Sequence, residues 1–315
     1  MSTQMLRVTK IESLSPLVKR FRFEHPQGRK LPLFSGGAHI VVEMPDGDVL
    51  RRNAYSLISD PEDGSGYEIA VRREDGGRGG SRFMHGQVGP GDMMRISTPL
   101  NLFALDMRAR KHVLLAGGIG ITPIIAQMQQ LLRMQGRFEI HYAARSRAEA
   151  AGLRLLPDLP HIHAHISDEG NRMDLGAILD RQPIGTHVYT CGPQGLITAV
   201  TQCAERLHWP RSSLHSEVFL APPPGRTFEV TLAKSGQRVT VGPHQSLLEA
   251  LEEAGVDIDW SCRGGACGRC ETEVVSCHGR IEHNDHWLTE DEHSSQTRIM
   301  PCVSRFRGEE LIINR

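Results

Sequence analysis

The sequence predicts three consecutive domains: an antiparallel β-barrel over residues 1–105, a doubly wound α/β domain over 106–221 and an α+β domain over 222–315. Short alternating segments separated by Gly, Pro and Asp turns fill the first third of the chain. Apolar strands then alternate with helices, and a proline-rich stretch finally precedes a cysteine-rich loop. A length of 315 residues suits about two or three domains of ordinary size.

In the first domain, alternating apolar and polar residues predict strands at 21–24, 39–43 and 67–71. Several short strands at this spacing favour a small barrel. One short helix is expected over 81–87, where Ser81 would open it.

The second domain begins with an apolar strand at 112–116 and a glycine-rich turn. Thr122 suits the N-cap of the following helix and Pro123 its first position. The helix is expected to run to about Gln135, with Gly136 as its stop. Further strands are predicted at 138–143, 162–166 and 187–190. This alternation is typical of a doubly wound parallel sheet.

The third domain follows the segment 221–225, Ala-Pro-Pro-Pro-Gly, which has the composition of a stiff, extended linker. A hairpin is expected from 228–232 and 238–241, and a helix over 246–254. This domain is acidic, because residues 226–315 carry 10 Lys and Arg against 15 Asp and Glu. The rest of the chain carries 26 against 22, so an acidic module follows a mildly basic body.

The composition excludes several classes of protein. With 39% apolar and 23% charged residues, the chain can build ordinary globular cores. A formal net charge of −1 gives no general attraction to nucleic acid or to an anionic membrane, and neither partner is expected. The amino terminus lacks the apolar segment of a secretory signal, and the longest apolar run, 113–126, is too short to cross a bilayer. We therefore expect a cytoplasmic protein.

Four cysteines carry the strongest functional signal. Cys262, Cys267 and Cys270 have the C-x4-C-x2-C spacing, and Cys302 lies in a distant Pro-Cys-Val-Ser segment. This is the plant-type arrangement for a 2Fe-2S cluster held by four thiolates. Small residues between the cysteines allow backbone N–H groups to approach the sulfurs. We predict that these four residues hold a 2Fe-2S cluster.

Other uses of the cysteines fit less well. A zinc site would favour paired C-x2-C units, and only one such unit is present. A Rieske cluster needs two histidine ligands, and neither cysteine segment contains one. Cys277 is interpreted as a free thiol and Cys203 as a core residue of a helix.

The 16 histidines include two groups that deserve an interpretation. His161, His163 and His165 alternate along a predicted strand and would share one face, as some metal sites require. Because no clear carboxylate partner is evident nearby, a polar strand face is preferred. The second group is interpreted as solvated and consists of His278, His283, His286 and His293.

With the cysteine motif in place, the whole chain resembles the reductase components of Rieske oxygenase systems, in the phthalate dioxygenase reductase branch. Proteins of this branch carry an FMN-binding barrel, an NAD-binding domain and a C-terminal plant-type ferredoxin of the β-grasp fold, in that order. Within the branch, the stretch Asn-Ala-Tyr-Ser-Leu at 53–57 is most similar to reductase subunits of carnitine monooxygenase-type systems.

The resemblance implies a flavin site at this stretch. Tyr55 would pack along the flavin, and Ser56 would lie near its N5 edge as a catalytic residue. Asn53 stands where the family has an arginine that contacts the flavin phosphate. Phosphate binding would then depend on another cofactor-binding segment.

A glycine turn is the candidate for that segment. Gly79, Gly80 and Ser81 lead into a helix amino terminus, which is a ready anion site, and they resemble the family's FMN phosphate loop. The other flavin contacts implied by the resemblance are Ala70, Val71, Arg72, Thr122 and Phe219. FMN is expected rather than FAD because this branch lacks an adenosine-binding extension.

A second glycine turn predicts the nicotinamide site. It contains Gly117, Gly118 and Gly120, and it lets the backbone approach a dinucleotide. After a later strand come Cys191, Gly192 and Pro193. The resemblance places Cys191 near the nicotinamide C4 and the flavin N5, as a second catalytic residue, and Arg145 on the adenosine side. NADH is expected more than NADPH.

These modules imply one electron path. A nicotinamide donates two electrons as hydride, a 2Fe-2S cluster carries one, and a flavin does both. The expected order is NADH, FMN, cluster and then a Rieske-type oxygenase component, onto which the acidic third domain would dock. Two other classes stay open. An iron–sulfur redox sensor with a degenerate flavin site would bind no flavin, and a self-contained flavin oxidase would need no partner.

Overall fold

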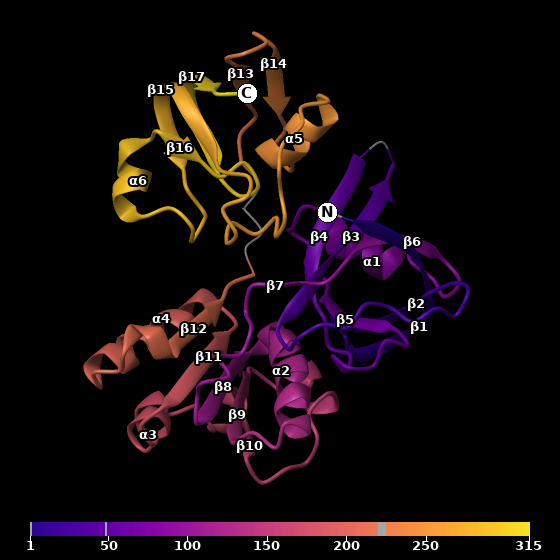
Figure 1. Cartoon of the computed structure of the whole chain (residues 1–315), viewed down its shortest axis with the longest axis vertical. Coiled ribbons are helices and arrows are strands. Elements are labelled where there is room, and N and C mark those ends of the chain that lie inside the picture. The colour runs from indigo at the N-terminus through magenta and orange to yellow at the C-terminus, as the bar shows by residue number, and fades with distance from the viewer. Residues whose placement is uncertain (1, 48, 220–224) are drawn as a thin grey trace.

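The computed structural model describes residues 2–47, 49–219 and 225–315. Three β-sheets, one for each third of the chain, form three bodies that meet near the centre of the molecule (Figure 1). Within the described residues, no helix is both long and apolar enough to cross a membrane.

The first body is an antiparallel sheet in the order β4-β3-β6-β1-β2-β5, with β7 beside β3. Its elements are β1 (Thr3–Ser15), β2 (Val18–Glu24), β3 (Ala38–Asp46), β4 (Val49–Ser56), β5 (Tyr67–Arg72), α1 (Gly80–Gly86), β6 (Met93–Ser97) and β7 (Leu100–Asn101). Side chains alternate across each strand, and the inner set, including Phe21, Phe23 and Ile40, forms one core. Phe83 and Met84 of α1 join that core.

The second body is a parallel sheet in the order β10-β9-β8-β11-β12. Its strands are β8 (Lys111–Gly117), β9 (Phe138–Ala144), β10 (Ile162–Ile166), β11 (Thr186–Cys191) and β12 (Leu214–Glu217). Its helices are α2 (Ile121–Arg133), α3 (Leu175–Asp180) and α4 (Gln194–Arg206), with short 3-10 turns at Gly118–Gly120, Ala151–Arg154, Ser167–Glu169 and Arg211–Ser213.

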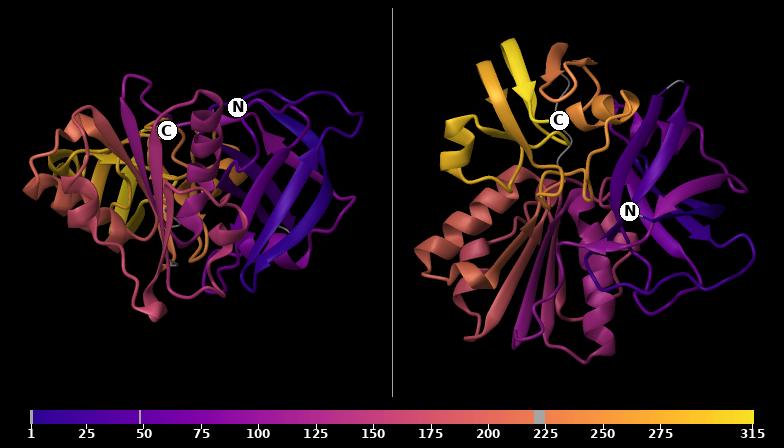
Figure 2. Two further views of the ribbon diagram at one scale, coloured as in Figure 1. Left: turned by 90° about the horizontal axis from the view of Figure 1, so that it is seen from below. Right: turned by 45° about the horizontal axis from the view of Figure 1, so that its top comes forward.

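Both faces of this parallel sheet are covered, so its strands are apolar on both sides. Leu114 and Ala116 of β8 pack in the core that contains α2, whereas Val113 and Leu115 face the core of α3 and α4. Figure 2 shows α2 between this sheet and the first body, with α4 on the opposite side.

The third body is a mixed sheet in the order β14-β13-β17-β15-β16. Its elements are β13 (Phe228–Leu232), β14 (Arg238–Val241), α5 (Leu247–Glu253), β15 (Thr272–Glu282), α6 (Glu290–Ser295), β16 (Arg298–Ile299) and β17 (Arg305–Ile313). The two helices are short, and each begins with a capping box, Ser246 with Glu249 and Thr289 with Glu292.

Three local expectations need correction. Thr122 is not an N-cap, because a 3-10 turn precedes α2 and Gly120 takes that position; the Thr122 hydroxyl instead donates to the Ile119 carbonyl at 3.0 Å. The helix α2 ends at Arg133 rather than near Gln135, whose φ of 53° is left-handed. Helix α1 starts at Gly80 rather than Ser81. Residues 221–224 of the expected linker lie outside the described residues.

Candidate functional site

The four cysteines of the predicted cluster lie together in the third body as free thiols. Cys262 shares a hydrogen bond with Cys267, and Cys270 shares one with Cys302. The backbone N–H groups of Gly264 and Ala266 also point at the Cys262 sulfur, at 3.4 and 3.5 Å. The bond to Cys267, together with these amides, lowers the pKa of Cys262 below that of a free thiol. Four converging sulfurs with amide support fit a four-thiolate iron–sulfur cluster.

The loop that presents three of these cysteines depends on left-handed backbone. Gly265 and Gly268 both have a φ of 72°, which favours glycine. A Cβ at Gly268 would lie only 2.3 Å from the Trp287 indole, so the ring packs directly on the backbone between Cys267 and Cys270. Trp287 itself stays half exposed. Gly265 and Gly268 are therefore required for two reasons: a side chain would clash with its neighbours, and the left-handed backbone favours glycine.

The remaining cysteines are placed apart from this group. Cys277 lies on β15, opposite Leu311 of β17, and Cys203 lies on α4 in the core behind the parallel sheet. These positions agree with the interpretation that neither residue belongs to the cluster.

In the first body, β4 sends alternate side chains to opposite faces. Asn53 lies against α1, because a Cβ at Gly80 would be 2.4 Å from its Nδ2 atom. The same Nδ2 donates to the Tyr55 hydroxyl at 3.2 Å. The Arg51 guanidinium lies against Gly79, whose Cβ would be 3.0 Å away. Arg51 thus brings a guanidinium, paired with Asp46 at 2.8 Å, to the amino end of α1, where Asn53 has only a neutral amide.

Other predicted flavin residues flank this position. Ser56 is buried at the end of β4, opposite His39 of β3. Ser81 accepts a hydrogen bond from the Glu74 amide at 3.0 Å, which closes the loop before α1. The residues predicted to face the ring, Ala70, Val71 and Arg72, lie together on β5.

The glycine crevice of the second body is formed by the carboxyl ends of β8 and β11, which are neighbours in the sheet. A Cβ at Gly120 would lie 2.3 Å from the Cys191 carbonyl oxygen, and one at Gly117 would lie 2.9 Å from Pro193 Cδ. A Cβ at Gly192 would in turn lie 2.9 Å from the Gly117 backbone nitrogen. Only glycine allows the two turns to approach this closely. Ligands of open α/β sheets bind at this edge.

The other predicted residues surround the same edge. Thr122 is buried in α2, and Gly118, with a φ of 56°, has open space beside it. Arg145 directly follows β9 and is exposed, while Phe219 follows β12 with 45% of its surface exposed. An exposed aromatic ring at a crevice fits a residue that covers a planar ligand.

Sequence reasoning missed Glu217 at this site. It is the last residue of β12, beside Cys191 of β11, and its Oε2 atom is buried without a hydrogen-bond partner among the described residues. Burial, reinforced by the neighbouring Cys262, raises the pKa of Glu217 to about 8. The available signal was its place at the carboxyl end of a parallel strand, two residues before Phe219.

The histidines divide differently from expectation. His283 and His293 are not simply solvated: their rings stack 4.3 Å apart and both face the buried Asp285, whose carboxylate lies 3.2 Å from His293 Nε2. The ligand atoms of His283, Asp285 and His293 all lie within 4.8 Å of one another. His163 and His165 stack on His141 of β9, while His161 precedes β10.

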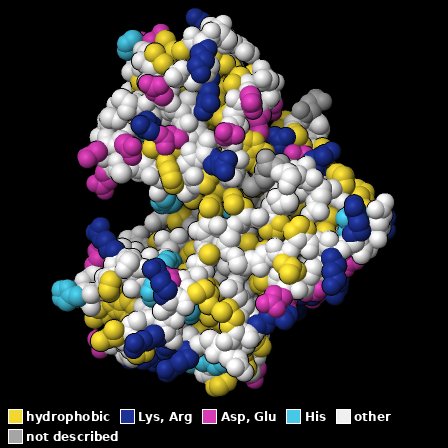
Figure 3. Space-filling model, viewed as in Figure 1, with side chains coloured by type: hydrophobic (Ala, Val, Ile, Leu, Met, Phe, Trp, Pro, Cys, Tyr) yellow, Lys and Arg dark blue, Asp and Glu magenta, His cyan; other side chains and the backbone are white. Residues whose placement is uncertain are grey.

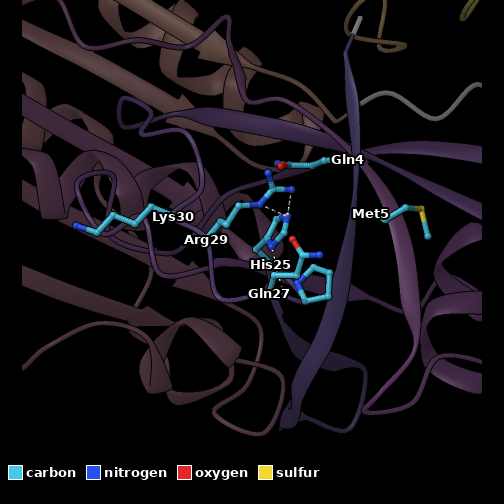
Figure 4. Close-up of a pocket in the computed structure, with 7 residues that line it drawn as sticks. Gln4, Met5, His25, Gln27, Arg29 and Lys30 are labelled. Carbon is cyan, nitrogen blue, oxygen red and sulfur yellow. Dashed lines mark hydrogen bonds between the residues drawn. The ribbon is translucent and has the colours of Figure 1, made fainter.

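A separate surface pocket lies on the first body, between β1 and the segment after β2 (Figure 4). Its wall includes Gln4, His25 and Arg29, and the Arg29 Nε donates to His25 Nε2 at 3.0 Å. None of the predicted site residues lines it.

Three domain families match the chain. Residues 5–104 match the oxidoreductase FAD-binding domain, and residues 230–307 match the 2Fe-2S iron-sulfur cluster binding domain. Residues 96–214 match the N-terminal domain of dimethylamine monooxygenase subunit DmmA-like proteins. A flavin and a 2Fe-2S cluster are therefore supported by the two flanking domains.

Whole-chain relatives agree with this. The chain is 44% identical to the heme-dependent oxidative N-demethylase beta subunit of Ectopseudomonas mendocina, over 100% of both chains. It is 41% identical to the carnitine monooxygenase reductase subunit of Escherichia coli, over 98% of this chain and 97% of that one. Its structure matches phthalate dioxygenase reductase with a TM-score of 0.89 at 33% identity, over 100% and 98% of the two chains.

This chain belongs to the phthalate dioxygenase reductase-like family. The predicted fold is thereby confirmed: a flavin-type antiparallel sheet, a parallel nucleotide-binding sheet and a ferredoxin domain, in that order. The chain is an oxidoreductase of the class that forms the reductase subunits of oxygenase systems.

Proposed function

We propose that this reductase takes electrons from NADH through FMN and a 2Fe-2S cluster and delivers them to a Rieske-type oxygenase. When bound, FMN accepts the hydride pair and the cluster carries single electrons. The main support for this proposal is that four cysteines converge, namely Cys262, Cys267, Cys270 and Cys302. They do so in a chain that aligns over 98% of its length with a reductase subunit. The proposal assigns FMN to residues 1–105, NADH to 106–221 and the cluster to 222–315.

The chain's own residues would hold these groups by simple chemistry. The four cysteines would ligate the irons, and the amides of Gly264 and Ala266 would stabilise thiolate charge at Cys262. The glycine crevice of Gly117, Gly120, Cys191, Gly192 and Pro193 would receive the nicotinamide end of NADH.

The phosphate of FMN is assigned to the amino end of α1. The Arg51 guanidinium lies beside the turn at Gly79 and Gly80, with its Nε paired to Asp46 at 2.8 Å, and its remaining N–H groups would donate to a terminal phosphate. Asn53 would add an amide donor beside it, and Tyr55 and Ser56, farther along β4, would contact the ring. Arg51 lies two residues before Asn53 on the same face of β4. It would thus take the phosphate-binding role of the family arginine that Asn53 replaces.

The oxygenase would dock on an acidic edge of the ferredoxin domain. Acidic side chains gather over α6, where the surface is hollowed toward the nucleotide domain (Figure 3). The first turn of α6 contains Glu290, Asp291 and Glu292. The half-exposed Trp287, just before α6, packs against Gly268 of the cluster loop nearby. An electron acceptor with a basic surface would fit this edge.

One observation favours a second kind of acceptor. The relative at 44% identity is a subunit of a heme-dependent N-demethylase, and the central region matches a dimethylamine monooxygenase subunit family. A heme-containing oxygenase is therefore the second candidate. Because carnitine, dimethylamine and N-demethylation recur among the relatives, we propose a methylated amine as the substrate of the partner in either case.

Two measurements test this function. An anaerobic absorption spectrum is recorded before and after NADH addition, and the released flavin is identified by chromatography. Bleaching of flavin and cluster bands with FMN released supports the proposal; a cluster spectrum that ignores NADH even after FMN is supplied overturns it. The acceptor is then identified by NADH-dependent demethylation with a purified Rieske-type or heme-type oxygenase. Turnover with the heme enzyme alone would replace the Rieske assignment.

A further inference from the structure

The helix α5 of the ferredoxin domain carries two glutamates whose partners belong to the flavin domain. Glu252 Oε2 accepts from Arg52 Nη1 at 2.9 Å, and Glu249 Oε2 accepts from Arg78 Nη1 at 2.8 Å. Spaced by three residues, the two glutamates lie on one face of the helix. Their side chains and those of both arginines are only 12–19% exposed. These pairs are therefore partly desolvated contacts rather than free surface ion pairs.

Glu252 also reaches the cluster loop. Its Oε1 accepts from Arg263, the residue directly after Cys262, whose side chain is only 4% exposed. The Arg263 guanidinium stacks on Trp260, 3.9 Å from the ring centroid, and Arg52 lies 5.9 Å from the same ring. One carboxylate thus joins the loop that holds the cysteines to the flavin domain.

The flavin-domain arginines belong to the two segments assigned to FMN. Arg52 lies on β4 between Arg51 and Asn53, and a second carboxylate, Glu43 of β3, holds it at 2.9 Å. Arg78 directly precedes Gly79. The contact therefore connects both flavin segments to α5, and through Glu252 to Cys262.

We propose that Glu249 and Glu252 form an intramolecular docking site for the flavin domain, with Glu252 as the positioning residue that orients the cluster loop for electron entry. The proposal rests on the proposed function. It adds the contact that holds the flavin domain against the ferredoxin domain for electron transfer from flavin to cluster. Contacts of this kind between domains are small and charge-dependent, so screening by salt weakens them. The acidic residues of α5 are then engaged within the chain, and those of α6 remain for the oxygenase.

The test replaces Arg52 and leaves the acidic helix intact. The variants are R52Q, R78Q, the charge-conserving R52K and the matched control R95Q. Arg95 of β6 pairs with the same Glu43, at 3.4 Å, but its side chain is exposed. Flavin and cluster content are measured for every variant. Small-angle X-ray scattering then reports domain docking, and anaerobic stopped-flow mixing with NADH follows the flavin and cluster bands separately.

R52Q and R78Q should increase the radius of gyration and slow cluster reduction by roughly tenfold, because each removes one of the two ion pairs between the domains. Glu252 keeps Arg263 as a partner and Glu249 keeps Ser246, so the ferredoxin domain itself should stay intact. Flavin reduction should stay within about twofold, R52K should recover most of the rate, and R95Q should match the wild type. Salt at about 0.5 M should slow cluster reduction in the wild type toward the rate of R52Q, and it should change the rate of R52Q little.

Cluster reduction at the wild-type rate in R52Q and R78Q, with unchanged scattering, would overturn the docking proposal while leaving the proposed function intact. A wild-type protein whose flavin is not reduced by NADH would overturn both, and this result appears before any variant is compared. The two failures are therefore distinguishable.

Discussion

Cys191 and Glu217 lie side by side at the ends of the parallel strands β11 and β12. Cys191 is fully buried and Glu217 is partly buried, and burial raises the pKa of each, strongly for Cys191 and to about 8 for Glu217. The two side chains form one wall of the nucleotide crevice. The Glu217 carboxyl has a buried oxygen without a partner among the described residues, so it is available to a ligand donor such as the nicotinamide carboxamide.

Glu217→Ala should raise the KM for NADH by roughly five- to tenfold, because it removes a hydrogen-bond acceptor from the crevice. Glu217→Gln retains a carbonyl acceptor of the same shape and should stay within about threefold of the wild type. Steady-state reduction of an artificial electron acceptor by NADH measures both variants. An alanine variant with an unchanged KM would show that the carboxyl does not contact NADH.

Cys302→Ser should abolish the cluster absorption bands, because the residue is the distant fourth thiolate of the group. Cys277→Ser is the matched control, since Cys277 lies on β15 away from that group. Iron and sulfide analysis together with the visible spectrum checks both proteins. Loss of iron in the Cys277 variant, or retention of a normal cluster in the Cys302 variant, would contradict the assigned ligands.

Gly268→Ala should reduce cluster incorporation strongly, because its Cβ would meet the Trp287 indole at 2.3 Å. Gly255→Ala separates this clash from backbone strain. Gly255 has a φ of 74°, almost equal to that of Gly268, but nothing lies within 4 Å of its Cβ position. Its left-handed strain alone should cost about 1–2 kcal/mol and leave the cluster in place. The iron content of the two purified proteins decides between steric and dihedral effects.

Gly80→Ala should weaken FMN binding by roughly tenfold or more, since the added methyl displaces Asn53 from the amino end of α1. Gly86→Ala in the same helix meets nothing within 4 Å and should bind FMN normally. Fluorescence titration of flavin-free protein with FMN provides the dissociation constants. Equal affinities in the two variants would place the phosphate elsewhere.

His39 makes the flavin domain sensitive to acid. It is buried on β3, its Nε2 has no hydrogen-bond partner among the residues that the structure describes, and burial lowers its pKa to about 4. The unfolded chain binds a proton near pH 6.5, whereas the folded chain does not until about pH 4. The free energy of unfolding should therefore fall by up to about 3 kcal/mol as the pH drops between these values.

The variant His39→Leu should lose this component, and its melting temperature should fall less on acidification than that of the wild type. Calorimetry of both proteins between these pH values measures the difference, which isolates His39 because any acid-induced cluster loss affects both alike. Parallel pH profiles would contradict the assigned role of His39.

Local features of this protein follow from its sequence alone. The C-x4-C-x2-C spacing and the glycine turns after apolar strands each involve residues close together in the chain. The hairpin at 228–232 and 238–241 was predicted with the bounds that the structure has. Short-range sterics and hydrogen bonds decide such features, so they can be read without tertiary structure.

Tertiary structure decided which charges and carboxylates meet. Arg51 and Arg52 are chemically identical neighbours, yet strand alternation sends one to Gly79 and the other to Glu252, 200 residues away. Glu217 lies beside Cys191 only because β12 pairs with β11, and Thr122 lost its expected cap because a 3-10 turn precedes its helix. Contacts between segments distant in the chain depend on how three cores pack, and no local pattern encodes that.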